Sequence, residues 1–216
     1  EIQPTIAMLE ALMNQLQDLK PARSFDLEPH VGDVREVADA YRDMHLITAK
    51  KVLYVLNVDE DMASGTKDNE YTLKVKEYAK AEGAESVIIS GRLEEELIEI
   101  DEESQQEMLA DLGMTEPGLN RMIRGGYDLL GLMTYFTAGV KEIRAWTIHK
   151  GDKAPAAAGK IHSDFERGFI CAEVYTLPDL QEAGEKSKLK EKGKLRQEGR
   201  DYVVQDGDVI EFRFNV

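Results

Sequence analysis

Apolar residues recur every three or four positions at the start of the chain. This spacing predicts a helix with one apolar face from Ile2 to Leu19, ended by Pro21. A second helix is predicted over residues 33–48, with Asp33 as its N-cap. Because an amphipathic helix must cover its apolar face, we expect Ile2–Leu19 to be a packed helix or half of a helical hairpin. If its apolar face is exposed, we expect it to drive dimerisation or local disorder. Its charges are mixed and sparse, which argues against a helix that lies on a membrane surface.

A continuous apolar run, Val52–Leu56, predicts a strand that is buried on both faces, as in a parallel sheet. A helix over residues 69–82 and a second buried strand over residues 86–89 follow it. Strand, helix and strand within so short a stretch predict a βαβ unit. Two further helices are predicted over residues 102–112 and 117–130.

Beyond Gly131 the pattern changes to short segments that are typical of β-strands. The predicted strands are Lys141–Lys150, Phe169–Val174, Asp201–Val204 and Val209–Phe214. The Asp206-Gly207 pair between the last two strands predicts a tight turn. Residues 179–184 and 186–196 are predicted to form a helical or loop insert. The chain is therefore predicted to be α/β in its first part and α+β, with a small mixed sheet, in its second.

Acidic charge is concentrated in the first part of the chain. The 216 residues carry 42 acidic and 27 basic side chains, which gives a formal net charge of −15. Residues 1–131 hold 28 of the acidic and 13 of the basic side chains, and residues 132–216 hold 14 of each. The whole acidic excess therefore lies before residue 132, and this step in composition predicts a domain boundary after Gly131.

Composition excludes several classes of protein. The negative charge argues against a surface that coats nucleic acid, although a local basic patch stays open. No apolar run approaches the roughly 20 residues that span a bilayer, so no membrane partner is expected. Cys171 is the single cysteine, so the chain has no internal disulfide and no cysteine-based metal site, and we expect Cys171 to be an inert core thiol. The expected location is the cytoplasm.

One stretch of the second part is strongly basic. Residues 186–196 read K-S-K-L-K-E-K-G-K-L-R, with one acidic residue. They form either a solvated loop or a patch that contacts RNA phosphates, because lysine replaces the counterions of a phosphate backbone. No aromatic residue lies among them, which argues against base stacking there. The candidate contact residues are Lys186, Lys188, Lys190, Lys192, Lys194 and Arg196.

Polar residues follow both predicted parallel strands. Asn57–Glu60 (N-V-D-E) comes after the first strand, and Ser90–Arg92 (S-G-R) comes after the second. Ligands of open parallel sheets bind beyond the carboxyl ends of the strands, so both segments lie where a ligand is expected. A carboxylate can accept from the N–H groups of a purine base, while an asparagine ties the two loops together. The alternative is an ordinary capped loop without a ligand.

Longer segments resemble one known family. T-A-K-K-V-L-Y-V-L-N-V-D-E (residues 48–60) resembles the base-specificity segment of the YchF family, the Obg-like ATPases of the P-loop GTPase superfamily. The resemblance covers essentially residues 20–216 without gaps. Further similar segments are residues 111–132, G-L-M-T-Y-F-T-A-G-V-K-E-I-R-A-W-T-I (131–148), G-K-I-H-S-D-F-E-R-G-F-I (159–170) and D-Y-V-V-Q-D-G-D-V-I-E-F-R-F-N-V (201–216).

The resemblance implies three parts. Residues 1–48 would be the remnant of a helical, coiled-coil insertion with a connecting helix, in which Ile2–Leu19 is one arm of a hairpin. Residues 49–131 would be the C-terminal part of the nucleotide-binding domain, with a partial P-loop GTPase-like parallel sheet. Residues 132–216 would be a TGS domain, a ubiquitin-like β-grasp module. Family members are thought to couple their nucleotide state to ribosome contact, so a ribosome or RNA partner is implied as well.

The resemblance also implies base-contacting residues at the strand ends, namely Asn57, Val58, Glu60, Ser90 and Gly91. The usual GTPase motif N-K-x-D is N-V-D-E here, and in the family this departure accompanies a preference for ATP over GTP. A longer carboxylate reaches differently toward the N1–H and N2–H₂ donors of guanine, both of which adenine lacks. The triplet Ser-Gly-Arg departs mildly from the Ser-Ala-Lys-like pattern expected after the second strand.

The phosphate-binding motif G-x-x-x-x-G-K-[ST] occurs nowhere in the chain, and neither do the family's switch segments that hold Mg²⁺. The family places both upstream, so the resemblance implies the C-terminal portion of an ATPase that uses ATP, or GTP, with Mg²⁺. Phosphoryl transfer needs phosphate positioning and a metal ion. We therefore expect this chain alone to have no catalytic residue and no metal ligand, and to bind nucleotide very weakly. The alternative is a stand-alone RNA- or ribosome-binding module without nucleotide function.

Overall fold

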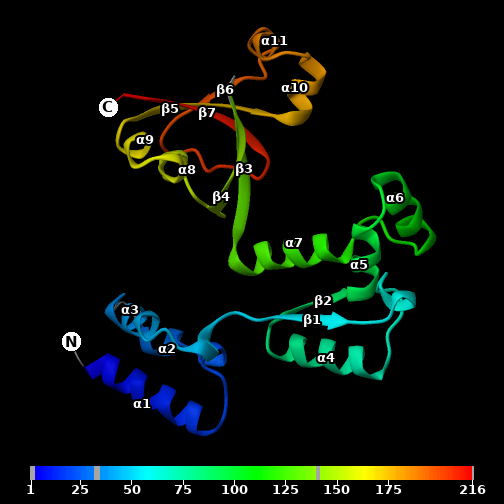
Figure 1. Cartoon of the computed structure of the whole chain (residues 1–216). Coiled ribbons are helices and arrows are strands. Elements are labelled where there is room, and N and C mark those ends of the chain that lie inside the picture. The colour runs from blue at the N-terminus through cyan, green and yellow to red at the C-terminus, as the bar shows by residue number, and fades with distance from the viewer. Residues whose placement is uncertain (1–2, 32–34, 140–141, 216) are drawn as a thin grey trace. The chain divides into compact units, whose positions relative to one another are not determined.

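The computed structural model describes residues 3–31, 35–139 and 142–215 of the chain (Figure 1). The chain divides into two units, Glu1–Gly125 and Gly126–Val216, and the division falls inside a helix, α7 (Gly118–Leu130). Each unit has its own apolar core.

The first unit begins with a cluster of short helices. One side of α1 is buried, where Met8 and Leu12 pack with Ala22 and Val37. The helix predicted over residues 33–48 is shorter than expected, because His45 adopts a φ of +48°, which a continuing helix does not allow. The predicted N-cap at residue 33 lies outside the described residues. The elements are α1 (Gln3–Gln17), η1 (Ala22–Ser24), α2 (Glu28–Val31), α3 (Arg35–Asp43) and η2 (Ile47–Ala49).

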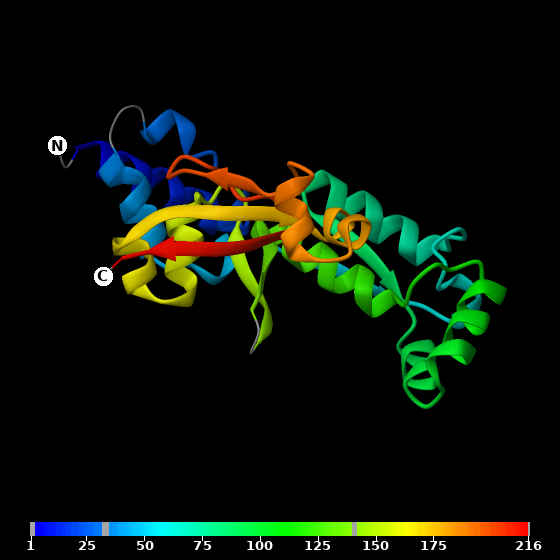
Figure 2. The same cartoon turned by 90° about the horizontal axis from the view of Figure 1, so that it is seen from above.

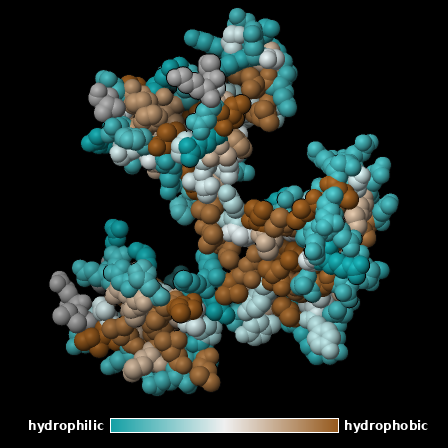
Figure 3. Space-filling view, viewed as in Figure 1, coloured by the Kyte–Doolittle hydropathy of each residue, from teal (hydrophilic) through white to brown (hydrophobic). Residues whose placement is uncertain are grey.

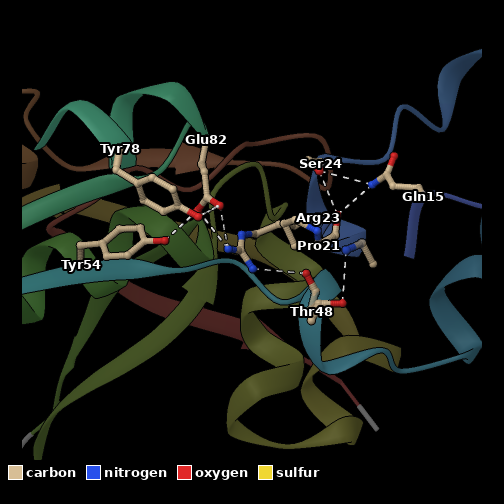
Figure 4. A network of polar contacts seen from close by, with 9 residues as sticks. Gln15, Pro21, Arg23, Ser24, Thr48, Tyr54, Tyr78 and Glu82 are labelled. Atoms are coloured by element: carbon tan, nitrogen blue, oxygen red, sulfur yellow. Dashed lines mark hydrogen bonds and ion pairs between the residues drawn. The ribbon is translucent and has the colours of Figure 1, made fainter. Parts of the chain in front are cut away.

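A polar network joins these helices to the rest of the first unit (Figure 4). Arg23 of η1 donates to both carboxylate oxygens of Glu82, at 2.9 and 3.2 Å. The hydroxyls of Tyr54 and Tyr78 donate to the same carboxylate at 2.7 and 2.9 Å. These hydrogen bonds, first that of Tyr54, hold the pKa of Glu82 below its usual value. The network therefore favours a charged carboxylate between the N-terminal helices and the sheet.

The predicted βαβ unit is present. β1 (Leu53–Asn57), α4 (Glu70–Ala81) and β2 (Glu85–Ile89) follow one another, and the two strands are parallel. The chain continues through α5 (Gly91–Ile98), α6 (Glu102–Asp111) and α7. α6 and α7 match the helices predicted over residues 102–112 and 117–130, whereas for α5 the carboxylates of residues 94–96 indicate a helix start without a predicted range. Only Leu93 and Leu97 of α5 are buried, and so short an apolar face gives little periodic signal.

The prediction that β1 and β2 are buried on both faces is wrong. Within the described residues Leu56 is the buried residue of β1, and Val55 is 42% exposed. This sheet has two strands in the described part of the chain, so each strand has one edge without a neighbour. On the covered side, Gly125 of α7 lies close to Leu53 and Val87, where a Cβ would meet the Val87 side chain at 3.2 Å. Apolar surface remains open over β1 and α7 (Figure 3).

The second unit contains a five-stranded sheet within the described residues, in the order β4-β3-β7-β5-β6. β3 and β7 are parallel at its centre, and the other neighbours are antiparallel. Helices α8 (Ala154–Ile161) and α9 (Ser163–Arg167) lie on one face of the sheet (Figure 2), where the buried Tyr135 hydroxyl donates to Ala157 O at 2.9 Å. The strands are β3 (Leu132–Ala138), β4 (Ile143–His149), β5 (Phe169–Thr176), β6 (Arg196–Glu198) and β7 (Asp208–Phe214).

Two short helices, α10 (Leu177–Ala183) and α11 (Lys186–Glu191), form the predicted insert after β5. Leu189 of α11 is fully buried and packs with Tyr175 and Val209 of the sheet. The first part of the basic stretch is therefore a helix anchored by one apolar side chain, and not a loop.

The second unit differs from the prediction in several details, first in β3 and β6, which have no counterpart among the predicted strands. Residues 201–204 form no strand, and Val203 makes an isolated bridge to Lys153. The turn at residues 205–208 is present, with Gly207 at a φ of +82°, but β7 pairs with β3 and β5 instead of closing a hairpin with residues 201–204. Cys171 is half-buried and not in the core, because side chains alternate between the two faces of β5 and the buried face belongs to Ala172.

Candidate functional site

The carboxyl ends of β1 and β2 lie side by side. The two strands pair in register, so that Asn57 is opposite Ile89. The Val58 N–H continues the pairing and donates to Ile89 O at 2.9 Å. The polar segments Asn57–Glu60 and Ser90–Arg92 therefore begin at the same edge of the sheet.

Asn57 joins the two segments directly. Its Oδ1 accepts the Gly91 N–H at 2.9 Å, although the two residues are 34 positions apart. Ser90, which is 1% exposed, caps α5, and its Oγ accepts the Leu93 N–H at 3.5 Å. Within the described residues, Asn57 Nδ2 donates to no protein group. The Asn57 side chain thus fixes the spacing of the loops and leaves an amide donor for a ligand.

A cleft of about 660 Å³ opens at this edge of the sheet. Of the five residues predicted to contact a base, four line the cleft, and the fifth, Gly91, donates its N–H to a lining residue. The volume is within the range of small-molecule sites, roughly 300–1,000 Å³. The lining residues are Asn57, Val58, Asp59, Glu60, Asp61, Met62, Asn69, Tyr71, Thr72, Ser90 and Arg92.

The start of α4 forms a wall of the cleft that sequence reasoning missed. Asn69 Oδ1 accepts the N–H groups of Tyr71 and Thr72 at 2.9 Å. Thr72 in turn donates to Asp68, and Lys76 pairs with Asp68 at 2.6 Å. The Lys76 hydrogen bond is the largest of the causes that lower the pKa of Asp68. A signal was present, because Asn-x-x-Thr ahead of a periodic apolar segment is typical of a capping box.

Glu60 and Arg92 form an ion pair at the mouth of the cleft, with Arg92 Nε 2.9 Å from Glu60 Oε1. Glu96, one turn further along α5, accepts from the same Nε at 3.2 Å. The hydrogen bond to Glu96, and then the charge of Glu60, raise the pKa of Arg92. Because the Arg92 side chain is 78% exposed, these pairs add little to stability. The pairs instead change what the cleft offers to a ligand, because a cation partly neutralises the Glu60 carboxylate and occupies it as an acceptor.

Helix α7 forms hydrogen bonds with the segments that follow both strands. Arg121 Nη2 donates at 2.7 Å to the carbonyl of Ala63, which follows η3 (Glu60–Met62). Glu94 of α5 accepts the Gly118 N–H at 2.7 Å. One helix therefore holds both loops, so the edge of the sheet is a connected structure and not two independent turns.

Within residues 3–31, 35–139 and 142–215, no group of three or more His, Cys, Asp or Glu side chains is arranged to hold a metal ion. In the same ranges, no helix is long and apolar enough to cross a membrane. The cleft lining brings amide, hydroxyl and carboxylate groups together, whereas the motif G-x-x-x-x-G-K-[ST], which cradles phosphates, does not occur in the sequence.

Most of the basic side chains of residues 186–196 have acidic partners within the chain. Lys194 is the best paired, and the hydrogen bond to Glu182 is the main cause that raises its pKa. Lys192 donates to the carbonyl oxygen of Glu182 at 3.0 Å. Lys190 is exposed and has no charged partner among the described residues. The ion pairs are Lys186–Glu211, Lys188–Glu185, Lys194–Asp179, Lys194–Glu182, Arg196–Glu198 and Arg196–Asp208.

Comparison with known proteins gives consistent matches. A family model described as "YchF-GTPase_C: Protein of unknown function (DUF933)" matches residues 132–215. The "Ribosome-binding ATPase YchF" of Bacillus subtilis (strain 168) is 47% identical over 209 residues, which are 97% of this chain and 56% of that protein. "Obg-like ATPase 1" of Pongo abelii is 45% identical over 198 residues, covering 91% of this chain and 48% of that protein.

A solved structure matches as well. The Schizosaccharomyces pombe YchF GTPase superposes with a TM-score of 0.77 at 33% sequence identity, covering 96% of this chain and 53% of that one. The chain thus spans about half the length of the relatives that it matches.

Proposed function

Because this chain belongs to the YchF family of Obg-like ATPases, of which it represents the C-terminal part, we propose that its first unit supplies the base-recognition end of a purine-nucleotide site. The observation that carries the proposal is the hydrogen bond from the Gly91 N–H to Asn57 Oδ1. It ties the loops after two parallel strands together beside a cleft, which is where such sheets bind ligands.

The proposed contacts follow from the donors and acceptors at this edge. Asn57 Nδ2 and the Val58 carbonyl are proposed to contact an incoming base, because the Val58 N–H already donates to Ile89 O. Ser90 and Glu60 are proposed as further contacts in the cleft lining, together with Gly91, which is tied to Asn57. ATP is the proposed nucleotide, and GTP the weaker ligand. Adenine lacks the N1–H and N2–H₂ donors of guanine, so its binding does not require hydrogen bonds to the Glu60 carboxylate. In the longer protein the nucleotide is proposed to carry Mg²⁺.

We expect no ATP hydrolysis by this chain alone, because it has no phosphate-binding motif to position the reacting group. Its own contribution is proposed to be recognition of the base. Without phosphate contacts, we expect a dissociation constant in the millimolar range, which corresponds to a binding free energy of about 4 kcal/mol. Robust turnover by the purified 216-residue chain would contradict this assignment.

The test is a titration of the ¹⁵N-labelled chain with ATP and with GTP, followed by NMR. The amide signals of Val58 and Gly91 are expected to shift in a saturable way, and at lower concentrations of ATP than of GTP. Tyr71 at the cleft wall is a third reporter. An unchanged spectrum at these positions would reject the proposed base site.

The second unit is proposed to be a TGS domain with the ubiquitin-like β-grasp fold. The order of its strands supports this, since the first and the last strand of the unit, β3 and β7, lie parallel at the centre of the sheet with antiparallel strands outside them. The proposed location of the protein is the cytoplasm. The exposed face of α1, with Ile6, Leu9 and Met13 all at least 41% exposed, is proposed to support a dimer.

A second candidate function is contact with RNA or the ribosome through α11. A specific observation favours it, since Lys188 and Lys190 protrude from a helix that Leu189 anchors to the sheet. Charge reversal at both lysines (K188E/K190E) is expected to weaken binding to purified ribosomes. It should also flatten the slope of log K against log salt, by about 0.7–0.9 for each lost phosphate contact.

The control for this test is K74E, which reverses one exposed lysine of the first unit. Equal binding and an equal salt slope for K188E/K190E and the unmodified chain would reject the α11 contact.

A further inference from the structure

Arg92 is the one cationic side chain among the described residues that line the cleft. The opposite loop lines the cleft with three consecutive carboxylates, Asp59, Glu60 and Asp61, and Arg92 interacts with the first two of them. Its Nε lies 2.9 Å from Glu60 Oε1 and is shared with Glu96 at 3.2 Å. Within the described residues its two Nη groups make no hydrogen bond. The guanidinium is therefore held in place through one nitrogen while its other donors stay available.

This arrangement matters for which purine can bind. A carboxylate that recognises guanine must offer free oxygens to two donors, N1–H and N2–H₂. The Glu60 carboxylate is already the partner of a cation, and its side chain is 34% exposed, so it is only partly open to a ligand. A guanine would have to compete with Arg92 for it.

Adenine offers the opposite pattern at this position, because its N1 is an acceptor and it has no N2 amino group. A free carboxylate would repel that acceptor, whereas a guanidinium can donate to it. The cation also reduces the negative charge that the three carboxylates would otherwise present to a polyanionic nucleotide.

We propose that Arg92 is a specificity-determining residue of this cleft, which favours adenine by engaging Glu60 and by turning this wall from an acceptor into a donor surface. The inference rests on the proposed function of the cleft as a purine site. It assigns the choice of base to the Arg92–Glu60 pair, and not to the length of the Glu60 side chain alone.

The experiment compares ATP and GTP titrations of the ¹⁵N-labelled 216-residue chain and of its variants, read at the Val58 and Gly91 amides. The Arg92 Nε–H signal is read in addition wherever Arg92 is kept, in the unmodified chain and in R124A. R92A is expected to move the ratio of the ATP and GTP dissociation constants about tenfold toward GTP, the effect of one hydrogen bond to a charged group. The double variant R92A/E60Q is expected to lose that gain for GTP, because a glutamine cannot accept both guanine donors. R124A removes another exposed Arg–Glu pair of the same unit, outside the cleft lining, and should leave the ratio unchanged.

An unchanged ratio in R92A would overturn the role of Arg92 while leaving the purine site in place. A tenfold change that persists in R92A/E60Q would overturn the action through Glu60. If the unmodified chain shows no purine-dependent shift at Val58 and Gly91, the proposed function itself fails, and this outcome is distinct from the other two.

Discussion

At the scale of single residues, the site depends on side chains whose partners are distant in sequence. Asn57 is exposed and contributes little to the core, yet its Oδ1 holds the backbone of the loop after β2. A residue of this kind can be changed without loss of the fold. Its two functional atoms can also be separated, because aspartate keeps the acceptor and removes the amide donor.

We predict that N57A and N57D separate the two roles of this side chain. N57A should lose both the tie to Gly91 and the donor to the base, and its affinity for ATP should fall about tenfold. N57D should keep the Gly91 amide at its original chemical shift in the free chain and still bind ATP more weakly. NMR titration measures both effects, with N120A on the exposed face of α7 as the control. ATP binding by N57D at the original strength would contradict a base contact through Nδ2.

Gly168 is fixed by the close approach of a neighbouring backbone. It follows α9, and a Cβ at this position would overlap the carbonyl oxygen of Asn215. The same residues are joined by a hydrogen bond from the Asn215 N–H to Gly168 O at 2.9 Å. Any side chain here must displace Asn215, the residue that follows β7.

We therefore predict that G168A destabilises the chain by about 1–3 kcal/mol, as overpacking does. The free energy of unfolding in urea measures the effect. G199A is the matched control, since a Cβ at Gly199 meets no atom within 4 Å and should change stability by less than about 0.5 kcal/mol. Equal unfolding midpoints for the two variants would count against the steric explanation.

At the scale of elements, the N-terminal helices are attached to the sheet through one carboxylate. Glu82 follows α4 and accepts from Arg23, Tyr54 and Tyr78, and its side chain is 13% exposed (Figure 4). Its pKa is lowered in the folded chain, so folding favours the charged form. The stabilisation is present above the ordinary pKa of a glutamate and is lost as the pH falls through the lowered folded-state pKa.

E82Q is accordingly expected to lower the urea midpoint at pH 7 and to reduce the loss of stability between pH 5 and pH 3. Unfolding curves at several pH values test this, with E77Q, an exposed position on the same helix, as the control. A pH dependence in E82Q as steep as in the unmodified chain would show that other carboxylates carry it.

At the scale of the whole chain, charge and exposed apolar surface are unevenly distributed. The first unit holds 27 acidic and 13 basic side chains, and the second holds 15 and 14. The first unit also carries the exposed apolar stripe of α1. This stripe is separate from the side of α1 on which Met8 and Leu12 are buried. A substitution in the stripe should therefore not unfold the helix cluster.

We predict that the chain associates with itself through this stripe in a concentration-dependent way. Sedimentation equilibrium should give a mass that rises above 24.3 kDa as concentration increases. M13E should bring the mass back to that of a monomer, because burying a charge in an apolar contact is costly. N14E, on the neighbouring polar position of the same helix, should not. A constant mass of 24.3 kDa for the unmodified chain would exclude the dimer.

The sequence by itself determined the features that depend on neighbours within a turn or a strand. It determined the βαβ unit and α7, because periodic apolar positions and local caps are read over a few residues. It also placed the two polar segments at one edge of a sheet, because parallel strands bring their carboxyl ends together. Similarity along nearly the whole chain identified the family.

Only the tertiary structure decided which distant groups meet. The bond between Asn57 and Gly91, the pairing of Glu60 with Arg92, and the start of α4 as a wall of the cleft all depend on packing between elements. The ion pairs of the basic stretch also depend on packing between elements, since Lys186 pairs with Glu211 of β7 and Arg196 pairs with Asp208 of β7. The burial of β1 could not be predicted from its apolar run either, because such a run has the same sequence whether or not a neighbouring strand covers it.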